Sequence, residues 1–195
     1  ATNELIKMKF IKTEIPEVYI IEPSVFGDNR GYFLESFNLQ KFEENVCEIK
    51  FVQDNESKSS KGVLRGLHFQ KPPYNQAKLV RCVEGRVIDV AVDIRKNSPT
   101  FLQWHGEIIT ASNRRSLVIP EGFAHGFQAL TDDCEIIYCV TAAYSAENEC
   151  IINAIDPGIA VSWPLPITKR SARDSEQPDI DSTFTGLSLL AASNT

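Results

Sequence analysis

The 195-residue sequence predicts one all-β domain, a β-sandwich or barrel with a few short helices. Short stretches rich in branched and aromatic residues recur about every 8–12 residues, with turn residues between them. Only two stretches have helical spacing, and no repeat, low-complexity tract or linker interrupts the chain. The composition, 43% apolar and 24% charged, is that of an ordinary globular protein. Residues 1–195 are therefore expected to form a single domain.

The N-terminal third is expected to contain strands and one helix. Residues 1–7 precede the only methionine and are expected to be a flexible extension. Residues 18–23 indicate a strand, and residues 26–35 a turn followed by a second strand. Within residues 38–44 two apolar side chains are spaced by three, which indicates a short helix. Residues 51–55 then indicate an extended segment, and residues 57–61 a Ser/Lys loop.

Residues 62–70 place His68 inside an apolar, strand-like stretch. Alternation puts His68 and Gln70 on one face of this strand and Arg65 on the other. A glycine within a strand often marks a bulge, so an irregularity near Gly66 is expected, and it would let Arg65 and His68 line one cavity. The alternative is a core histidine satisfied by a backbone carbonyl.

Residues 78–83 and 86–95 indicate a β-hairpin with its turn at Glu84–Gly85. In the first arm Lys78, Val80 and Cys82 share a face. The second arm has an apolar face formed by Ile88, Val90, Val92 and Ile94. Its other face carries Val87, Asp89, Ala91, Asp93 and Arg95.

The remaining elements follow in the same way. Residues 104–110 and 116–119 indicate two strands, and residues 120–127 a glycine-containing turn that carries His125. Apolar alternation from Cys134 to Val140 indicates another strand, which includes Tyr138. Residues 153–163 are expected to close the β region and residues 170–174 to form one helical turn. Residues 175–195 are expected to be an irregular tail.

Charge and cysteine content restrict the function classes. The formal net charge is −6 with no basic block, which argues against nucleic-acid binding and against an anionic membrane surface. No run approaches the ~20 apolar residues of a membrane span, and no secretion signal is recognisable. Five cysteines without a Cys-x-x-Cys pair indicate reduced thiols and a cytoplasmic location.

General acid–base chemistry is the best match to the polar residues. The three histidines, His68, His105 and His125, are far apart, so no metal site is predicted, and no Gly-x-Ser-x-Gly elbow is present. His68 is a candidate base and Tyr138 a candidate acid, and Lys78 is a candidate to stabilise negative charge. The alternative for Tyr138 is a core aromatic residue whose hydroxyl is hydrogen-bonded. For Arg30, Arg65 and Arg173 the alternative is a solvated surface charge.

A set of motifs in fixed order resembles the dTDP-4-dehydrorhamnose 3,5-epimerase family. They lie at residues 25–31, 51–55, 63–70, 78–82, 89–95, 98–101, 120–127 and 171–174. The resemblance implies a cupin-type jelly roll, a homodimer, and neither a metal nor an organic cofactor. It also implies a dTDP-4-keto-6-deoxyhexose substrate.

The resemblance implies roles for individual residues. His68 matches the family's base, Asp174 the carboxylate that orients it, Tyr138 the proton donor and Lys78 a cation beside the substrate oxygen. Tyr144 matches the aromatic ring that stacks on thymine. The other matches to nucleotide-sugar contacts are Arg30, Glu35, Gln53, Asp54, Asn55, Arg65, His125, Glu149 and Arg173. Arg173 stands where relatives often have lysine, which keeps the charge and changes the contact geometry.

The predicted function is a cofactor-independent epimerase that inverts C3 and C5 through an enolate, in dTDP-L-rhamnose-type sugar biosynthesis. A base on one face and an acid on the other are what inversion requires. The alternatives are a single-centre epimerase or ketoisomerase of a related nucleotide sugar, and a non-catalytic sugar-nucleotide-binding cupin. His68 and Tyr138 together disfavour ketoisomerisation, but they do not separate one inverted centre from two.

Overall fold

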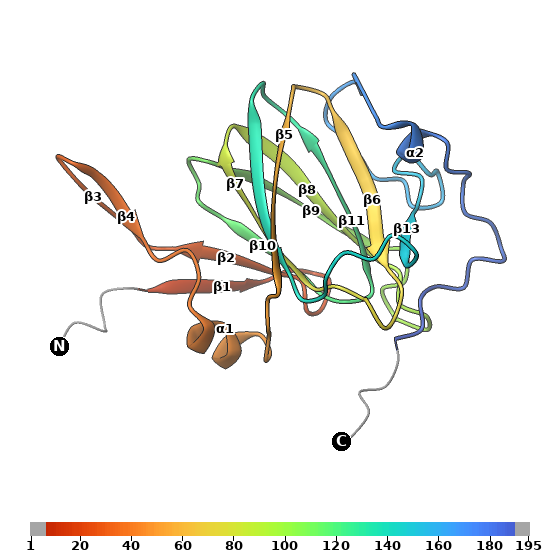
Figure 1. Ribbon diagram of the computed structural model, residues 1–195, viewed down its shortest axis with the longest axis horizontal. Coiled ribbons are helices and arrows are strands. Elements are labelled where there is room, and N and C mark those ends of the chain that lie inside the picture. Colours follow the sequence, from red (N-terminus) through yellow and green to blue (C-terminus); the bar gives the residue numbers. More distant parts are fainter. Residues whose placement is uncertain (1–6, 190–195) are drawn as a thin grey trace.

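The computed structural model describes residues 7–189, and in them the chain forms two packed antiparallel sheets (Figure 1). The six-stranded sheet has the order β1 (Met8–Lys12), β2 (Tyr19–Pro23), β10 (Ser116–Ile119), β7 (Lys78–Glu84), β12 (Cys134–Val140) and β5 (Gln53–Ser59). The five-stranded sheet has the order β13 (Glu149–Ile151), β6 (Leu64–Gln70), β11 (Phe123–Ala129), β8 (Arg86–Asp93) and β9 (Trp104–Thr110). The predicted all-β jelly roll is confirmed.

Alternation along the strands decides which side chains enter the core. Val87 and Ala91 of β8 pack between the two sheets, against Val80 and Cys82 of β7. The apolar residues that alternate with them pack on the outer face of the five-stranded sheet. They are Ile88, Val90, Val92 and Ile94, and the C-terminal segment from residue 152 to residue 187 covers them. The predicted division of this strand into two faces is confirmed.

The predicted hairpin of residues 78–95 is wrong. Its two arms are strands, but β7 pairs with β10 and β12, whereas β8 pairs with β9 and β11. The turn at Gly85, which has a φ of 75°, carries the chain from one sheet to the other. A short turn between two alternating strands does not determine pairing, because hydrogen-bond partners come from distant parts of the chain.

Two further strands lie where loops or turns were expected. β5 continues to Ser59, so residues 57–59 belong to a strand and not to the predicted loop. His125 lies within β11 and not in a turn. The turn was predicted there because of its glycines, but Gly126 has another role. A Cβ atom on Gly126 would lie 2.6 Å from the backbone oxygen of Arg65, so the glycine permits close approach of β6 and β11. Residues 153–163 contain no strand, and β13 precedes them.

The irregularity expected near Gly66 is present. Gly66 has a φ of 114°, and the pairing of β6 with β11 shifts register between His125 and Phe127. A Cβ atom on Gly66 would lie 2.6 Å from the backbone oxygen of His125. The backbone deviation brings Arg65 and His68, which regular alternation would separate, to the wall of one cavity.

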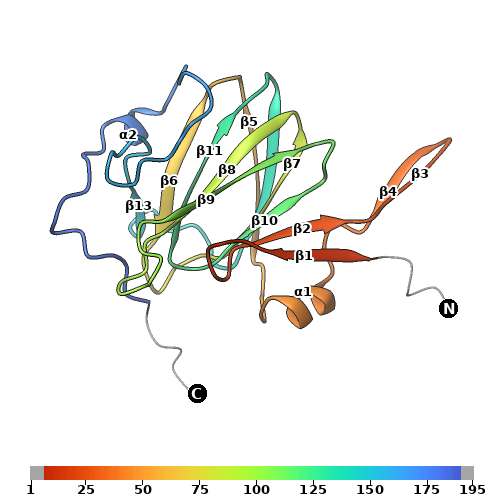
Figure 2. The ribbon, with the colours of Figure 1, turned by 180° about the vertical axis from the view of Figure 1, so that it is seen from behind.

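The N-terminal elements lie at one end of the sandwich. The hairpin of β3 (Val25–Asp28) and β4 (Gly31–Leu34) projects away from both sheets in Figures 1 and 2. The helix α1 (Leu39–Asn45) is capped by Asn38, whose side chain accepts a hydrogen bond from the Lys41 N–H at 3.0 Å, and it buries Phe42. Across residues 7–189 no helix has the length and apolar character needed to cross a membrane.

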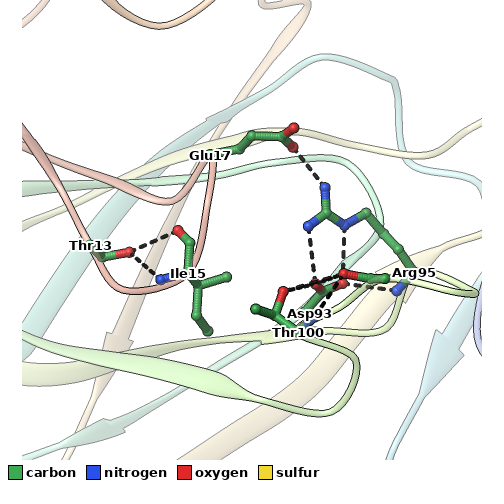
Figure 3. A network of polar contacts seen from close by, with 7 residues as sticks. Thr13, Ile15, Glu17, Asp93, Arg95 and Thr100 are labelled. Carbon is green, nitrogen blue, oxygen red and sulfur yellow. Dashed lines mark hydrogen bonds and ion pairs between the residues drawn. The ribbon is translucent and has the colours of Figure 1, made fainter.

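A polar network ties the β1–β2 connection to the end of β8 (Figure 3). The Asp93 carboxylate is fully buried and accepts two hydrogen bonds from the Arg95 guanidinium, each 3.0 Å long. Ser98 and Thr100 donate to it at 2.6 Å. Arg95 also bonds Glu17 at 2.8 Å, so one guanidinium joins two connections that are distant in sequence.

Candidate active site

A buried carboxylate holds the candidate base. The Nε2 atom of His68 on β6 lies 2.7 Å from Oδ1 of Asp174 on the short helix α2 (Ala172–Ser175). The Gly66 N–H donates to the other carboxylate oxygen at 3.2 Å. Burial raises the pKa of Asp174, but the His68, Gly66 and Ser171 hydrogen bonds and the His68 charge outweigh it, so the net shift is downward. An ionised Asp174 only accepts, so Nε2 carries the proton and Nδ1 is free to act as a base.

Local sequence explains how α2 presents Asp174. The Ser171 hydroxyl accepts a hydrogen bond from the Asp174 N–H at 3.1 Å, as an N-cap residue does. The guanidinium of Arg170 donates to the backbone oxygen of Asp174 at 2.6 Å and to the Asn153 side chain at 3.0 Å. The single helical turn expected at residues 170–174 is thus present, slightly later in the chain, and fixed at both ends.

Seven of the fourteen predicted site residues line one cavity of about 450 Å³, the His68 cavity. Its lining residues are Gln53, Asn55, His68, Phe69, Gln70, Gln76, Lys78, Tyr138, Tyr144 and Glu149. His68 also lines a second cavity of about 390 Å³, which carries Lys58, Arg65, Lys169 and Arg170. The His68 imidazole therefore lies between the His68 cavity, whose polar lining is mixed, and a second cavity whose charged residues are mostly basic.

Lys78 and Tyr138 reach the His68 cavity from the opposite sheet. Lys78 is buried, and burial lowers the pKa of its ammonium to about 8, although Asp89 and Glu149 oppose the shift. At neutral pH it is still mostly charged. Burial raises the pKa of the Tyr138 hydroxyl, which keeps that group protonated. The cavity thus combines a free imidazole nitrogen, an ammonium and a phenol.

His125 lies behind the cavity wall. Its Nε2 atom lies 2.7 Å from Oδ1 of the fully buried Asp89, and its ring packs edge-on against Tyr138 with centroids 6.2 Å apart. Burial lowers the pKa of His125, so the ring is neutral at physiological pH. His125 does not line the His68 cavity, and its role as a substrate contact stays a prediction.

Three of the predicted substrate contacts are linked by hydrogen bonds at the rim of the His68 cavity. The Glu149 carboxylate accepts a hydrogen bond from the Tyr144 hydroxyl at 3.0 Å and one from Arg173 at 2.6 Å. Tyr144 is 54% exposed, so its ring is accessible for stacking. Gln53 accepts from the Tyr144 N–H at 3.1 Å and donates to Asn55 at 2.8 Å.

Three other predicted contacts lie outside the His68 cavity of their own chain. Arg30 lies in the exposed turn of the β3–β4 hairpin, where it pairs with Asp28. Glu35 forms an ion pair with Lys41 at 2.7 Å. Asp54 points to the other face of β5 from Gln53 and Asn55 and lines a neighbouring cavity of about 130 Å³. Their roles stay predictions.

Sequence reasoning did not assign several residues that the structure brings to the site. Gln70 and Gln76 line the His68 cavity. Gln70 shares the face of His68, and that parity was the available signal. Asp89 was placed on a strand face, but no pattern in the sequence shows that it meets His125. Arg170 had no signal, because its partners, the Asp174 backbone oxygen and the Asn153 side chain, are brought to it only by the fold.

Comparisons with known proteins agree on one family. A family model described as dTDP-4-dehydrorhamnose 3,5-epimerase matches residues 12–182. The chain is 56% identical over 168 residues to the Shigella flexneri protein of that name, covering 86% of this chain and 93% of the relative.

Two solved structures extend this similarity. The Legionella pneumophila epimerase RmlC in complex with dTDP-4-keto-L-rhamnose is 45% identical, with a TM-score of 0.87 over 93% of this chain and 98% of that one. The Streptomyces bikiniensis 3'-monoepimerase ChmJ in complex with dTDP-quinovose is 32% identical, with a TM-score of 0.82 over 87% and 86%.

Proposed function

The chain belongs to the dTDP-4-dehydrorhamnose 3,5-epimerase family, and from that premise we propose that His68, Lys78 and Tyr138 carry out its chemistry on a dTDP-4-keto-6-deoxyhexose. The activity is the inversion of C3 and C5 in dTDP-L-rhamnose synthesis. One observation carries the assignment of residues: His68 from one sheet and Lys78 and Tyr138 from the other line the same cavity.

The chemistry follows from the positions of these groups. C3 and C5 both flank the 4-keto carbon, so a proton on either is acidic once the enolate is stabilised. His68 removes this proton through Nδ1, and the electron pair moves to the carbonyl oxygen, beside the Lys78 ammonium. Tyr138 then donates its phenolic proton to the opposite face of the same carbon. Proton exchange with solvent restores the neutral imidazole and the phenol.

The rim residues are proposed to hold the nucleotide. Tyr144 offers an exposed ring for the base, and Arg173 and Arg65 offer guanidinium groups for the diphosphate. Arg173 must exchange its bond with Glu149 for one with phosphate. Gln53 and Asn55 complete the proposed contacts from β5.

The test is incubation with dTDP-4-keto-6-deoxyglucose in D2O, followed by NMR of the recovered sugar. Deuterium at both C3 and C5 with net inversion is the expected result. Deuterium at one carbon only would support a single-centre epimerase, an alternative kept because the ChmJ 3'-monoepimerase has a similar chain fold. Tight dTDP binding without any exchange would support a non-catalytic binding protein.

A homodimer is part of the proposal, because the β3–β4 hairpin has the features of an intermolecular arm. It projects from the sandwich and exposes four large apolar side chains, Val25, Phe26, Tyr32 and Phe33, by 47%, 39%, 58% and 62%. Arg30 lies at its tip and away from the His68 cavity of the same chain. We propose that the arm packs on a second copy and brings Arg30 to the cavity of that copy.

Mixed dimers test this arrangement. Arg30→Ala and His68→Ala chains are each expected to be inactive or weak as homodimers. If Arg30 acts across the interface, mixing the two restores about a quarter of wild-type activity, because half of the dimers contain one complete site. A mixture as inactive as its components would place Arg30 in its own chain's site or outside any site.

We also propose a cytoplasmic location, since all five cysteines are free, as expected in a reducing compartment. The free cysteines are Cys47, Cys82, Cys134, Cys139 and Cys150.

A further inference from the structure

The inner face of β8 carries two fully buried carboxylates that differ in their surroundings. Asp93 accepts hydrogen bonds from Arg95, Ser98 and Thr100, and both of its oxygens are used. Asp89 has one hydrogen bond, to Nε2 of His125 at 2.7 Å. Its other oxygen, Oδ2, is buried and has no hydrogen-bond partner in the part of the chain described. A half-satisfied buried carboxylate is costly unless a positive charge lies close by.

His125 does not supply that charge. Burial lowers the pKa of His125, and nearby Lys78 and His68 lower it further, against the attraction of Asp89. The ring is therefore neutral at physiological pH and donates Nε2–H to the carboxylate. The Asp89 carboxylate lies between the sheets, and among residues 7–189 no lysine or arginine forms an ion pair with it.

Lys78 is the cation that enters this interior from the other sheet, because it shares the inward face of β7 with Val80 and Cys82. It lies on β7, in the opposite sheet, and its side chain is almost completely buried. Burial lowers the pKa of Lys78 to about 8, and two carboxylates oppose the shift, Asp89 first and then Glu149 of β13. The other titratable groups that line the His68 cavity are His68 of β6, Tyr138 of β12 and Tyr144, and His125 of β11 lies behind its wall. The second cavity adds Lys58, Arg65, Lys169, Arg170 and Asp174. No hydrogen bond or ion pair joins Lys78 to Asp89 within the described residues, so their attraction acts through space in a low dielectric.

Resting on the proposed function, we propose that Asp89 is a positioning residue: its charge holds Lys78 in the ammonium form, and its Oδ1 atom fixes the ring of His125. An ammonium stabilises the developing enolate, and a neutral amine does not. Asp89 thus extends the alkaline limit of catalysis without contacting the substrate.

The first test is a pH–rate profile of Asp89→Asn. The amide oxygen still accepts from His125, so the variant removes the charge and keeps the shape. The alkaline limb of kcat/KM is expected to move down by about one pH unit, which lowers the charged fraction of Lys78 at pH 8 about fivefold. His125→Gln, which keeps the Asp89 charge, is the matched control and is expected to leave the alkaline limb in place.

The second test does not depend on activity. Lys78 is titrated by NMR in protein labelled with carbon-13 at lysine Cε, with the signal assigned by its loss in Lys78→Met. The titration midpoint is expected to fall in Asp89→Asn and to stay in place in His125→Gln. An unchanged midpoint in Asp89→Asn overturns the proposal. If the midpoint falls but the wild-type protein shows no exchange with the keto-sugar, the Asp89–Lys78 coupling stands and the proposed function fails.

A third measurement, of melting temperature, tests the proposal if Asp89→Asn folds poorly. If Asp89→Asn leaves an uncompensated ammonium in the interior, the double variant Asp89→Asn/Lys78→Met is expected to melt at a higher temperature than Asp89→Asn alone. A double variant that melts no higher than the single one would show that the two residues are not coupled, and would overturn the proposal.

Discussion

The Nε2 atom of His68 lies 2.7 Å from Oδ1 of Asp174, although 106 residues separate the two in sequence. The pair joins a strand of the sandwich to a helix of four residues that packs outside it. Without the Asp174 carboxylate, the proton of the His68 imidazole is no longer held on Nε2, and this is expected to impair His68 as a base. Asp174→Asn is expected to lower kcat by about 10²–10⁴-fold, by analogy with other histidine–carboxylate pairs. Ser171→Ala, which removes only the helix cap, is the control and should cost about 1 kcal/mol of stability and little activity.

Isotope exchange is expected to distinguish the role of His68 as base from that of Tyr138 as acid. His68→Ala is expected to abolish both turnover and deuterium uptake, because it removes the imidazole nitrogen that serves as the base, while the Lys78 ammonium and the Tyr138 phenol stay mostly protonated at neutral pH. Tyr138→Phe still permits enolate formation at His68, and reprotonation from the same face restores the original configuration. Deuterium uptake without net inversion is therefore the expected signature of Tyr138→Phe. Exchange at the wild-type rate in His68→Ala would remove His68 from the mechanism.

The Tyr144 ring is expected to contribute to nucleotide affinity. Stacking on a base contributes roughly 1–3 kcal/mol, so Tyr144→Ala should weaken dTDP binding about tenfold or more in isothermal titration calorimetry. Tyr144→Phe is the matched control: it loses the hydrogen bond to Glu149, keeps the ring and should retain most of the affinity. Equal dissociation constants for the alanine variant and the wild type would place the base elsewhere.

Asp93 is expected to make folding stability depend on acid pH. Burial raises its pKa, but hydrogen bonds from Arg95, Ser98 and Thr100 outweigh this and lower the pKa below its ordinary value. A depressed pKa contributes stability above the unfolded value of about 3.9, and this contribution is lost as pH falls through the folded value.

The Asp93 contribution is measured by urea unfolding across pH. Arg95→Met leaves the buried charge uncompensated and should cost about 3–5 kcal/mol at pH 7. Asp93→Asn should lower stability at pH 7 and flatten its fall below about pH 5. Asp28→Asn is the control, because Asp28 is also paired with an arginine, Arg30, but lies on the exposed hairpin. An equal change of slope in both variants would contradict the prediction.

Catalysis is expected to need no metal. Among the described residues no group of three His, Cys, Asp or Glu side chains is arranged to hold an ion. Turnover should therefore survive exhaustive chelation with EDTA. Loss of activity that one divalent ion restores would contradict this.

Local sequence determined the elements whose stability depends on near neighbours. The alternation of Ile88, Val90, Val92 and Ile94 predicted both faces of β8, because side-chain direction in a strand has a period of two. The short helix followed from the spacing of Leu39 and Phe42, and the irregularity at Gly66 from a glycine inside a strand. The ordered motifs predicted the family and the candidate residues that the cavity gathers.

Only the tertiary structure decided which strands pair and which charges meet. The turn at Gly85 predicted a hairpin, yet β7 and β8 lie in opposite sheets, because partners are chosen by burial of both faces across the whole chain. The same separation lets buried Lys78 and buried Asp89 enter the interior from opposite sheets, and the close approach of β6 and β11 at two glycines brings His125 to the Asp89 carboxylate. Electrostatic coupling depends on distance in space and on the local dielectric, and the order of residues along the chain specifies neither of them.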